Sequence, residues 1–289
     1  MKKPLFTGVC TALVTPFIDG KINFPMLRIL LKRQLESGVK AVVLAGTTGE
    51  SATLSDGEKL ALFKAAKDYV GNDMQIFAGT GSNATGHAIE LSQAAQDVGV
   101  DGLLLVSPYY NKATPDGLVA HYSTIAESIQ LPIILYNVPS RTGLDMPVSV
   151  YRQLSQISNI AGIKEASADL GKILHIRAQC PSHFAIWAGN DHLTVPILSL
   201  GGKGVISVLS NLLPEEMSIM TDAALDGDFD TAAALQATLL PWTDFLSSEV
   251  NPIPIKAAMA HYGYDCGAGR LPLTPLSASG YERLKRLSS

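Results

Sequence analysis

The segment IAGIKEAS, residues 160–167, begins with an apolar run that ends at a charged residue, Lys164. Continuous rather than alternating apolar character predicts a strand that is covered on both faces, as in a parallel sheet. Removing an ammonium ion from water is costly, so a lysine at this place usually keeps its charged end in solvent. A chemical role for Lys164 therefore depends on which residues the fold brings beside it.

Seven other short runs along the chain share this apolar pattern. Together with residues 160–164, they span residues 8–14, 41–44, 75–78, 102–106, 132–136, 184–188 and 204–208. Segments with helical periodicity separate them, as after Asn23, after the capping-box pair Ser55 and Glu58, and after Thr114, which precedes Pro115. Strand followed by helix, eight times over, predicts an α/β fold, a (β/α)8 TIM barrel. An open doubly wound sheet is the alternative.

The alternation stops after residue 225, which divides the chain into two regions. Residues 1–225 are expected to form the catalytic barrel, and residues 226–289 a small C-terminal helical appendage. We expect this appendage to be helical in several pieces, broken at Pro241, at residues 251–254 and at residues 267–275.

Composition excludes several classes of function. The chain has 289 residues, 47% of them hydrophobic, and a formal net charge of −4 without basic runs, so neither nucleic acid nor a membrane surface is an expected partner. Its three cysteines form no CxxC pair, and no segment resembles a signal peptide or a membrane span, which predicts a cytoplasmic protein. The six histidines lack metal-ligand spacing, so no metal is expected.

Residues 79–84 offer a competing motif, because GTGSNA matches the G-x-G-x-x-A pattern of a dinucleotide site after a strand. The ribose-binding acid of such a site should end the next strand, whereas Asp101 begins it. This motif is weak, and no cofactor is expected.

Polar side chains follow several of the predicted strands, at the barrel end where active sites lie. Thr47 and Thr48 follow the second strand, Tyr136 and Arg141 the fifth, and Lys164 closes the sixth. Each has an ordinary explanation, as a tight turn, a core aromatic or a surface charge. Together they predict a pocket for an organic acid, where Arg141 and the threonines bind carboxylates. A desolvated lysine amine can form a Schiff base there, with Tyr136 carrying protons.

Specific motifs, in order along nearly the whole chain, resemble those of the dihydrodipicolinate synthase family. They are GTTGES (46–51), SPYYN (107–111), YNVPSRTG (136–143), GIKEAS (162–167), GVISV (204–208) and NPIPIK (251–256). The broader family includes N-acetylneuraminate lyase and 2-keto-3-deoxy sugar acid aldolases. Arg141 and the double threonine favour the synthase, and a sugar-acid lyase remains the alternative within this scaffold.

The resemblance implies a reaction, and it assigns a role to each site residue. Pyruvate would form a Schiff base with Lys164 and condense with aspartate 4-semialdehyde, giving 4-hydroxy-tetrahydrodipicolinate in lysine and diaminopimelate biosynthesis. It implies a homo-oligomer, most simply a homotetramer, because Tyr110 would enter a neighbouring subunit's site. The implied roles are a proton relay of Thr47, Tyr136 and Tyr110, pyruvate binding by Thr47 and Thr48, aldehyde binding by Arg141, and a pocket lining that includes Gly189 and Ile206.

The resemblance also places a regulatory lysine site of inhibited relatives on seven residues: Ser51, Ala52, Asp56, Lys59, Asn83, His87 and Tyr109. Three of the seven depart from the inhibited pattern, with Asp56 and Lys59 in place of histidines and His87 in place of a glutamate. A cation at Lys59, and no carboxylate at position 87, should repel a cationic effector. We expect weak or absent inhibition by lysine. Outside this family, a nicotinamide oxidoreductase and a noncatalytic small-acid binding protein remain open.

Overall fold

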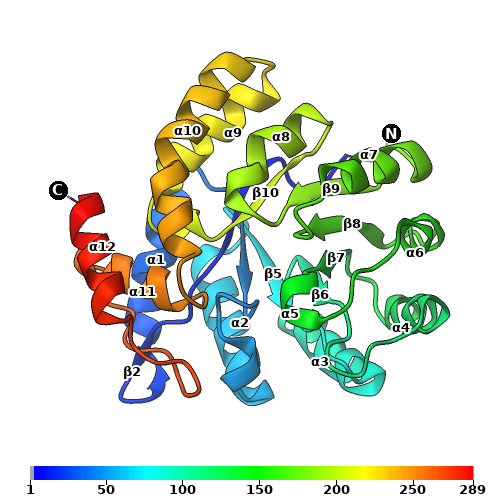
Figure 1. Cartoon of the computed structure of the whole chain (residues 1–289). Coiled ribbons are helices and arrows are strands. Elements are labelled where there is room, and N and C mark those ends of the chain that lie inside the picture. Colours follow the sequence, from blue (N-terminus) through cyan, green and yellow to red (C-terminus); the bar gives the residue numbers. More distant parts are fainter. Residues whose placement is uncertain (1–2, 289) are drawn as a thin grey trace.

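A closed barrel of eight parallel strands forms the centre of the computed structural model, which describes residues 3–288 (Figure 1). Strand β10 pairs with β1, which closes the sheet and excludes the open-sheet alternative. The TIM-barrel prediction is therefore confirmed. The strands are β1 (Gly8–Ala12), β4 (Ala41–Leu44), β5 (Gln75–Gly79), β6 (Gly102–Val106), β7 (Ile133–Asn137), β8 (Ile160–Glu165), β9 (Ala185–Ala188) and β10 (Gly204–Ser207).

Helices surround this barrel and cover the outer face of its strands (Figure 1). The expected caps are present: Asn23 Oδ1 accepts the Met26 N–H at 3.1 Å, and Ser55 and Glu58 form both bonds of a capping box. The covering helices are α1 (Phe24–Glu36), α2 (Asp56–Val70), α3 (Thr85–Val98), α4 (Pro115–Glu127), α6 (Val148–Leu154), α7 (Leu170–Gln179), α8 (Thr194–Ser199) and α9 (Pro214–Leu225).

Aromatic side chains fill the interior of the barrel from its N-terminal end. Phe6, which precedes β1, stacks on Trp187 of β9 with 4.9 Å between ring centroids, and Phe77 of β5 lies beside it. All three belong to one buried cluster inside the strands, separate from the larger core between strands and helices. Within residues 3–288, these side chains therefore close the N-terminal end of the barrel to a ligand.

Three short elements were not predicted from the sequence. Strands β2 (Phe17–Ile18) and β3 (Lys21–Ile22) form a small antiparallel hairpin, and α5 (Pro139–Thr142) is a single turn after β7. Elements of two or four residues are too short for hydrophobic periodicity to detect.

The C-terminal region contains α10 (Phe229–Leu246), α11 (Ile253–His261) and α12 (Ala278–Ser288). Helix α10 packs beside α8 and α9 (Figure 1). The predicted break at Pro241 is wrong, because α10 continues through it. Pro241 lies on the exposed side, where water can satisfy the carbonyl that loses its partner, and buried Leu239 and Phe245 hold the helix on either side.

No helix within residues 3–288 has the length and apolar character needed to cross a bilayer.

Candidate active site

Lys164 lies inside the barrel, on β8. Its register partners are Tyr136 on β7 and Trp187 on β9, and its side chain is buried. The Lys164 Nζ lies 4.4 Å from the centroid of the Tyr136 ring. None of the ion pairs among residues 3–288 involves Lys164. The amine therefore lies against the face of a phenol ring inside the barrel.

A cavity of about 430 Å³ opens above Lys164 at the C-terminal end of the barrel. Six of the eight predicted catalytic and substrate-binding residues line it: Thr47, Thr48, Tyr136, Arg141, Lys164 and Gly189. Ile206 does not, because it is fully buried in the cluster inside the strands. Tyr110 does not either, because its side chain is 90% exposed on the outer surface.

Gly189 is a position where only glycine fits. A Cβ atom there would lie 2.7 Å from the Cβ of Ala166 and 2.9 Å from the Glu165 carbonyl oxygen. Its N–H donates to that carbonyl at 2.8 Å, so the loop after β9 lies directly against the end of β8. This close approach keeps the cavity wall next to Lys164.

The threonine loop is anchored by a buried ion pair. Glu50, three residues after Thr47, has a left-handed backbone and no exposed side-chain surface. Its Oε1 accepts from the Lys256 Nζ at 2.6 Å, and its Oε2 accepts from the Arg270 N–H at 2.9 Å. Burial lowers the pKa of Lys256, although the charge of Glu50 opposes that effect. The C-terminal region thus holds the loop that carries Thr47 and Thr48.

Asn251, in the connection between α10 and α11, contacts both predicted carboxylate-binding groups. Its Nδ2 donates to the Thr48 Oγ1 at 2.9 Å, and its backbone oxygen accepts from the Arg141 Nη2 at 3.2 Å. The sequence placed Asn251 in the NPIPIK motif but predicted no role for it. No local pattern reveals a contact between residues this far apart in the chain.

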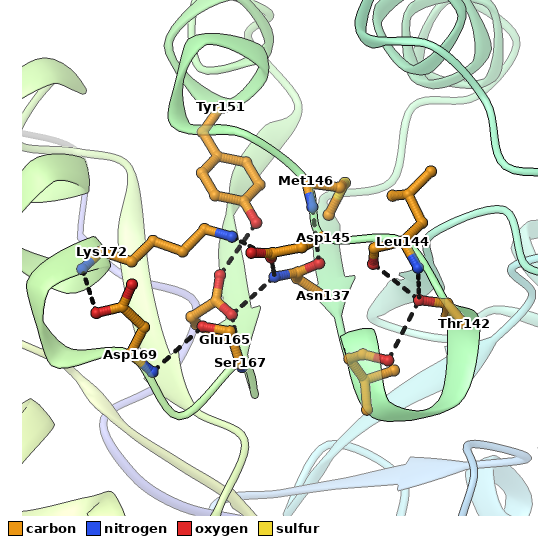
Figure 2. A network of polar contacts seen from close by, with 11 residues as sticks. Asn137, Thr142, Leu144, Asp145, Met146, Tyr151, Glu165, Ser167, Asp169 and Lys172 are labelled. Atoms are coloured by element: carbon orange, nitrogen blue, oxygen red, sulfur yellow. Dashed lines mark hydrogen bonds and ion pairs between the residues drawn. The ribbon is translucent and has the colours of Figure 1, made fainter.

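Glu165 is the residue after Lys164 and faces the opposite side of β8, where Figure 2 shows it within a polar network. Its carboxylate accepts from the Asn137 Nδ2 at 2.9 Å, the Ser167 N–H at 2.8 Å and the Tyr151 hydroxyl at 3.0 Å. Burial, and then the charge of Glu165, raise the pKa of Tyr151. These bonds fix the ends of β7 and β8, which carry Tyr136 and Lys164.

A second pair in the same network lies nearer the surface. Asp145 accepts from the Asn137 Nδ2 at 2.8 Å and forms an ion pair with Lys172 of α7 (Figure 2). The network thereby joins α7 to the β7 end of the barrel.

Asp191 is a half-buried acid that the sequence did not single out. One of its carboxylate oxygens accepts the N–H groups of Val208 and Leu209, each at 3.0 Å. Burial raises the pKa of Asp191. The residue lines the cavity and joins the loop after β9 to the loop after β10.

The predicted regulatory residues surround a second cavity of about 620 Å³. Ser51, Ala52, Asp56, Lys59, His87 and Tyr109 line it, and Asn83 lies beside it, where its Nδ2 donates to the Tyr109 carbonyl at 3.2 Å. Tyr136 and Arg141 line this cavity too, so the two cavities adjoin.

Asp56 of the second cavity is already paired within the chain. Its Oδ2 lies 2.7 Å from the His87 Nε2, and its Oδ1 accepts from the Lys59 Nζ at 3.2 Å. The bond to His87, more than the one to Lys59, lowers the pKa of Asp56. This carboxylate therefore has partners without an added cation.

The glycines of the competing dinucleotide motif are explained by packing. A Cβ atom at Gly79 would lie 2.2 Å from the Ala45 carbonyl oxygen, and one at Gly81 would lie 2.4 Å from the Val106 nitrogen. Neighbouring backbone thus occupies the space that a side chain would need, and the motif requires no nucleotide.

Comparisons with known proteins agree with this geometry. A model of the dihydrodipicolinate synthetase family matches residues 5–289. A 4-hydroxy-tetrahydrodipicolinate synthase from Acetivibrio thermocellus is 44% identical over 99% of this chain and 97% of its own. The solved structure of the same enzyme from Methylacidiphilum fumariolicum SolV has a TM-score of 0.96 at 43% identity, covering 98% of this chain and 95% of that one.

A third relative bears on assembly. The solved structure of a dihydrodipicolinate synthase described as the first monomeric variant has a TM-score of 0.96 at 38% identity, covering 98% of this chain and 96% of that one. Both the sequence and the fold match over nearly the full length. The chain is therefore a member of the dihydrodipicolinate synthetase family.

Proposed function

We propose that this chain condenses pyruvate with aspartate 4-semialdehyde to give 4-hydroxy-tetrahydrodipicolinate, as the names of its relatives indicate. The observation that carries the proposal is the buried Lys164 amine, 4.4 Å from the Tyr136 ring centroid, in a cavity that also contains Thr48 and Arg141. A nucleophilic amine beside two sites for carboxylates suits a keto acid and a second substrate that is also an acid.

The chemistry at Lys164 starts on the carbonyl carbon of pyruvate. The neutral amine adds to this carbon, water leaves, and the resulting iminium makes the methyl protons acidic. Loss of one proton gives an enamine, whose carbon attacks the aldehyde of the second substrate. The amino group of that substrate then attacks the imine carbon, which closes the ring and releases Lys164.

The threonines and Tyr136 support the first half of this reaction. Thr47 and Thr48 bind the pyruvate carboxylate, and the Tyr136 hydroxyl carries protons to and from the addition intermediate. Gly189 keeps the wall close to the imine, and Ile206 packs below it within the strands.

Arg141 determines which second substrate is accepted. Its guanidinium is exposed at the mouth of the cavity, where it can bind the aspartate semialdehyde carboxylate in a bidentate manner. A sugar-acid lyase on the same barrel is the rival function, and the synthase relatives over the full chain favour the first.

Tyr110 completes the proton relay from a second copy of the chain, so the enzyme is a homo-oligomer, most simply a homotetramer. Two observations support this: the side chain is 90% exposed, and its φ of +71° is rare for a non-glycine residue. The family contains a monomeric variant, which makes the oligomeric state worth measuring by light scattering.

Reduction with borohydride in the presence of pyruvate, followed by peptide mass mapping, tests the proposal. We expect an adduct on Lys164, and none in Lys164→Ala. An adduct elsewhere, or no adduct, overturns the mechanism. A coupled assay with aspartate semialdehyde, sialic acid and keto-deoxy acids separates the synthase from the lyase.

The second cavity should not make the enzyme sensitive to lysine. Asp56 is occupied by Lys59 and His87, and an added ammonium ion meets the like charge of Lys59. We expect millimolar lysine to leave the initial rate nearly unchanged. Half-suppression by submillimolar lysine would contradict this expectation.

A further inference from the structure

We infer that Asn251 is a positioning residue that directs the Thr48 hydroxyl toward the pyruvate carboxylate and holds Arg141 in place through its backbone oxygen. This inference rests on the proposed function, because it assumes that Thr48 and Arg141 bind carboxylates. Asn251 is the residue in which the two contacts meet: Nδ2 to the Thr48 Oγ1, and backbone oxygen to the Arg141 Nη2.

The direction of the bond to Thr48 decides what that hydroxyl can do. A threonine hydroxyl has one hydrogen to donate and two lone pairs that accept. Asn251 donates to the oxygen, which occupies one lone pair and leaves the hydrogen free. Thr48 is buried, and the open space beside it is the cavity above Lys164, so the free hydrogen is available to an anion there. The amide thereby makes Thr48 a donor to a carboxylate.

The bond to Arg141 affects the binding of the second substrate. Arg141 is exposed at the mouth of the cavity, where a long side chain would otherwise sample many rotamers. One guanidinium nitrogen donates to the Asn251 carbonyl, which leaves the remaining donors for a carboxylate. Pre-positioning of this kind lowers the entropic cost of binding.

The backbone around Asn251 is itself fixed. The Ile253 N–H donates to the Val250 carbonyl at 2.9 Å, and the Lys256 N–H donates to the Pro252 carbonyl at 3.1 Å. Lys256 then ends in the buried ion pair with Glu50, in the same loop as Thr48. Asn251 is thus held against the threonine loop from both its backbone and its side chain.

The side-chain amide of Asn251 can be replaced by a carboxylate of the same shape, and this variant tests the direction of the bond to Thr48. Among the described residues the Oδ1 atom of Asn251 is buried without a hydrogen-bond partner. In Asn251→Asp the shape is kept, but the Nδ2 donor becomes an acceptor. Thr48 would then donate to the new carboxylate instead of the substrate, and a negative charge would lie near both carboxylate sites.

Steady-state kinetics with Asn251→Ala and Asn251→Asp test the inference. We expect KM for pyruvate to rise about tenfold in the alanine variant, since one hydrogen bond to a charged group is lost, and further in the aspartate variant. The pyruvate concentration that gives half-maximal borohydride labelling of Lys164 should rise by the same factor, while the maximal labelling stays complete. A variant that is merely misfolded would lose maximal labelling instead.

A double-mutant cycle with Thr48→Val identifies the route of the effect. If Asn251 acts through the Thr48 hydroxyl, Asn251→Ala adds little to the pyruvate KM of Thr48→Val. Asn159→Ala is the matched control, because Asn159 bonds two backbone carbonyls at the other end of β8, and its pyruvate KM should match the wild type.

The outcomes separate this inference from the proposed function. Wild-type enzyme that is not labelled on Lys164 overturns both. Labelled wild type, with an unchanged pyruvate KM in both Asn251 variants, overturns the inference alone. Fully additive effects of Asn251→Ala and Thr48→Val likewise overturn it.

Discussion

Replacing Lys256 by methionine should destabilise the enzyme far more than the loss of an ordinary lysine. Its ammonium group and the Glu50 carboxylate are 2.6 Å apart, with side chains that are 5% and 0% exposed. Removing one partner of a buried pair leaves an uncompensated charge and costs about 3–5 kcal/mol. Lys256 Nζ also lies 4.4 Å from the centroid of the Phe17 ring, a contact that the methionine side chain partly preserves.

The loss is large relative to the free energy of unfolding of a folded protein, which is about 5–15 kcal/mol. Urea unfolding followed by circular dichroism measures it, with Lys64→Met as the control. Lys64 forms an ion pair with Asp68 at 3.3 Å, but both side chains are mostly exposed, so its replacement should cost less than about 1 kcal/mol.

A double variant shows whether the cost comes from the stranded charge. In the double variant Glu50→Gln/Lys256→Met, neither side chain of the pair is charged. The glutamine oxygen can still accept from the Arg270 N–H. We expect this protein to be more stable than Lys256→Met alone. If Lys256→Met costs no more than Lys64→Met, or if the two changes at the pair are additive, the reasoning about the buried ion pair is refuted.

Three further predictions concern other parts of the molecule. Tyr151→Phe leaves one Glu165 oxygen without its donor and should lower the free energy of unfolding by about 1–3 kcal/mol, measured by urea unfolding. The hydrogen bond from Arg270 lowers the pKa of Glu58 from 4.5 to about 2, so the contribution of Glu58 to stability is present above pH 4.5 and is lost as the pH falls toward 2. In Glu58→Gln the melting temperature should therefore depend less on pH in that range. A slope that equals the wild-type slope would contradict this prediction. Tyr110→Phe should lower kcat by about 10²-fold or more while leaving the fold intact, as expected for one proton-transfer group, and a wild-type kcat would exclude the relay.

The barrel could be predicted from the sequence because its strands are buried on both faces. The runs at 41–44 and 102–106 coincide with β4 and β6, and the run that contains Lys164 became β8 with one more residue. Local signals were equally sufficient for the caps at Asn23 and Ser55, since capping depends on residues only three positions apart.

Pro241 shows where local signals fail. A proline inside a helix costs a hydrogen bond, and the sequence contains nothing to say that the affected turn faces solvent while Leu239 and Phe245 pack against the rest of the molecule. Tertiary packing determined the outcome, and it cannot be inferred from a window of ten residues.

The candidate site shows the same difference between what local sequence signals predict and what depends on long-range contacts. Lys164, Tyr136 and the threonines follow predicted strands, so the barrel alone brings them together. Asn251 and the pair of Glu50 with Lys256 join residues more than 200 positions apart, and no periodicity reports such a contact. The predicted list therefore contained six residues that line the cavity but lacked the residues that hold them in place.

The stacked Phe6 and Trp187 in the barrel interior also have a kinetic consequence. Because they fill the barrel from the end opposite the cavity, both substrates enter, and the product leaves, through one mouth beside Arg141. Under the proposed function, pyruvate has to reach Lys164 inside the barrel, whereas the aldehyde would bind nearer the mouth, beside Arg141, and would obstruct the way to the amine. Under the proposed function we therefore expect the keto acid to add first and the aldehyde second, with no new pyruvate until the ring has left.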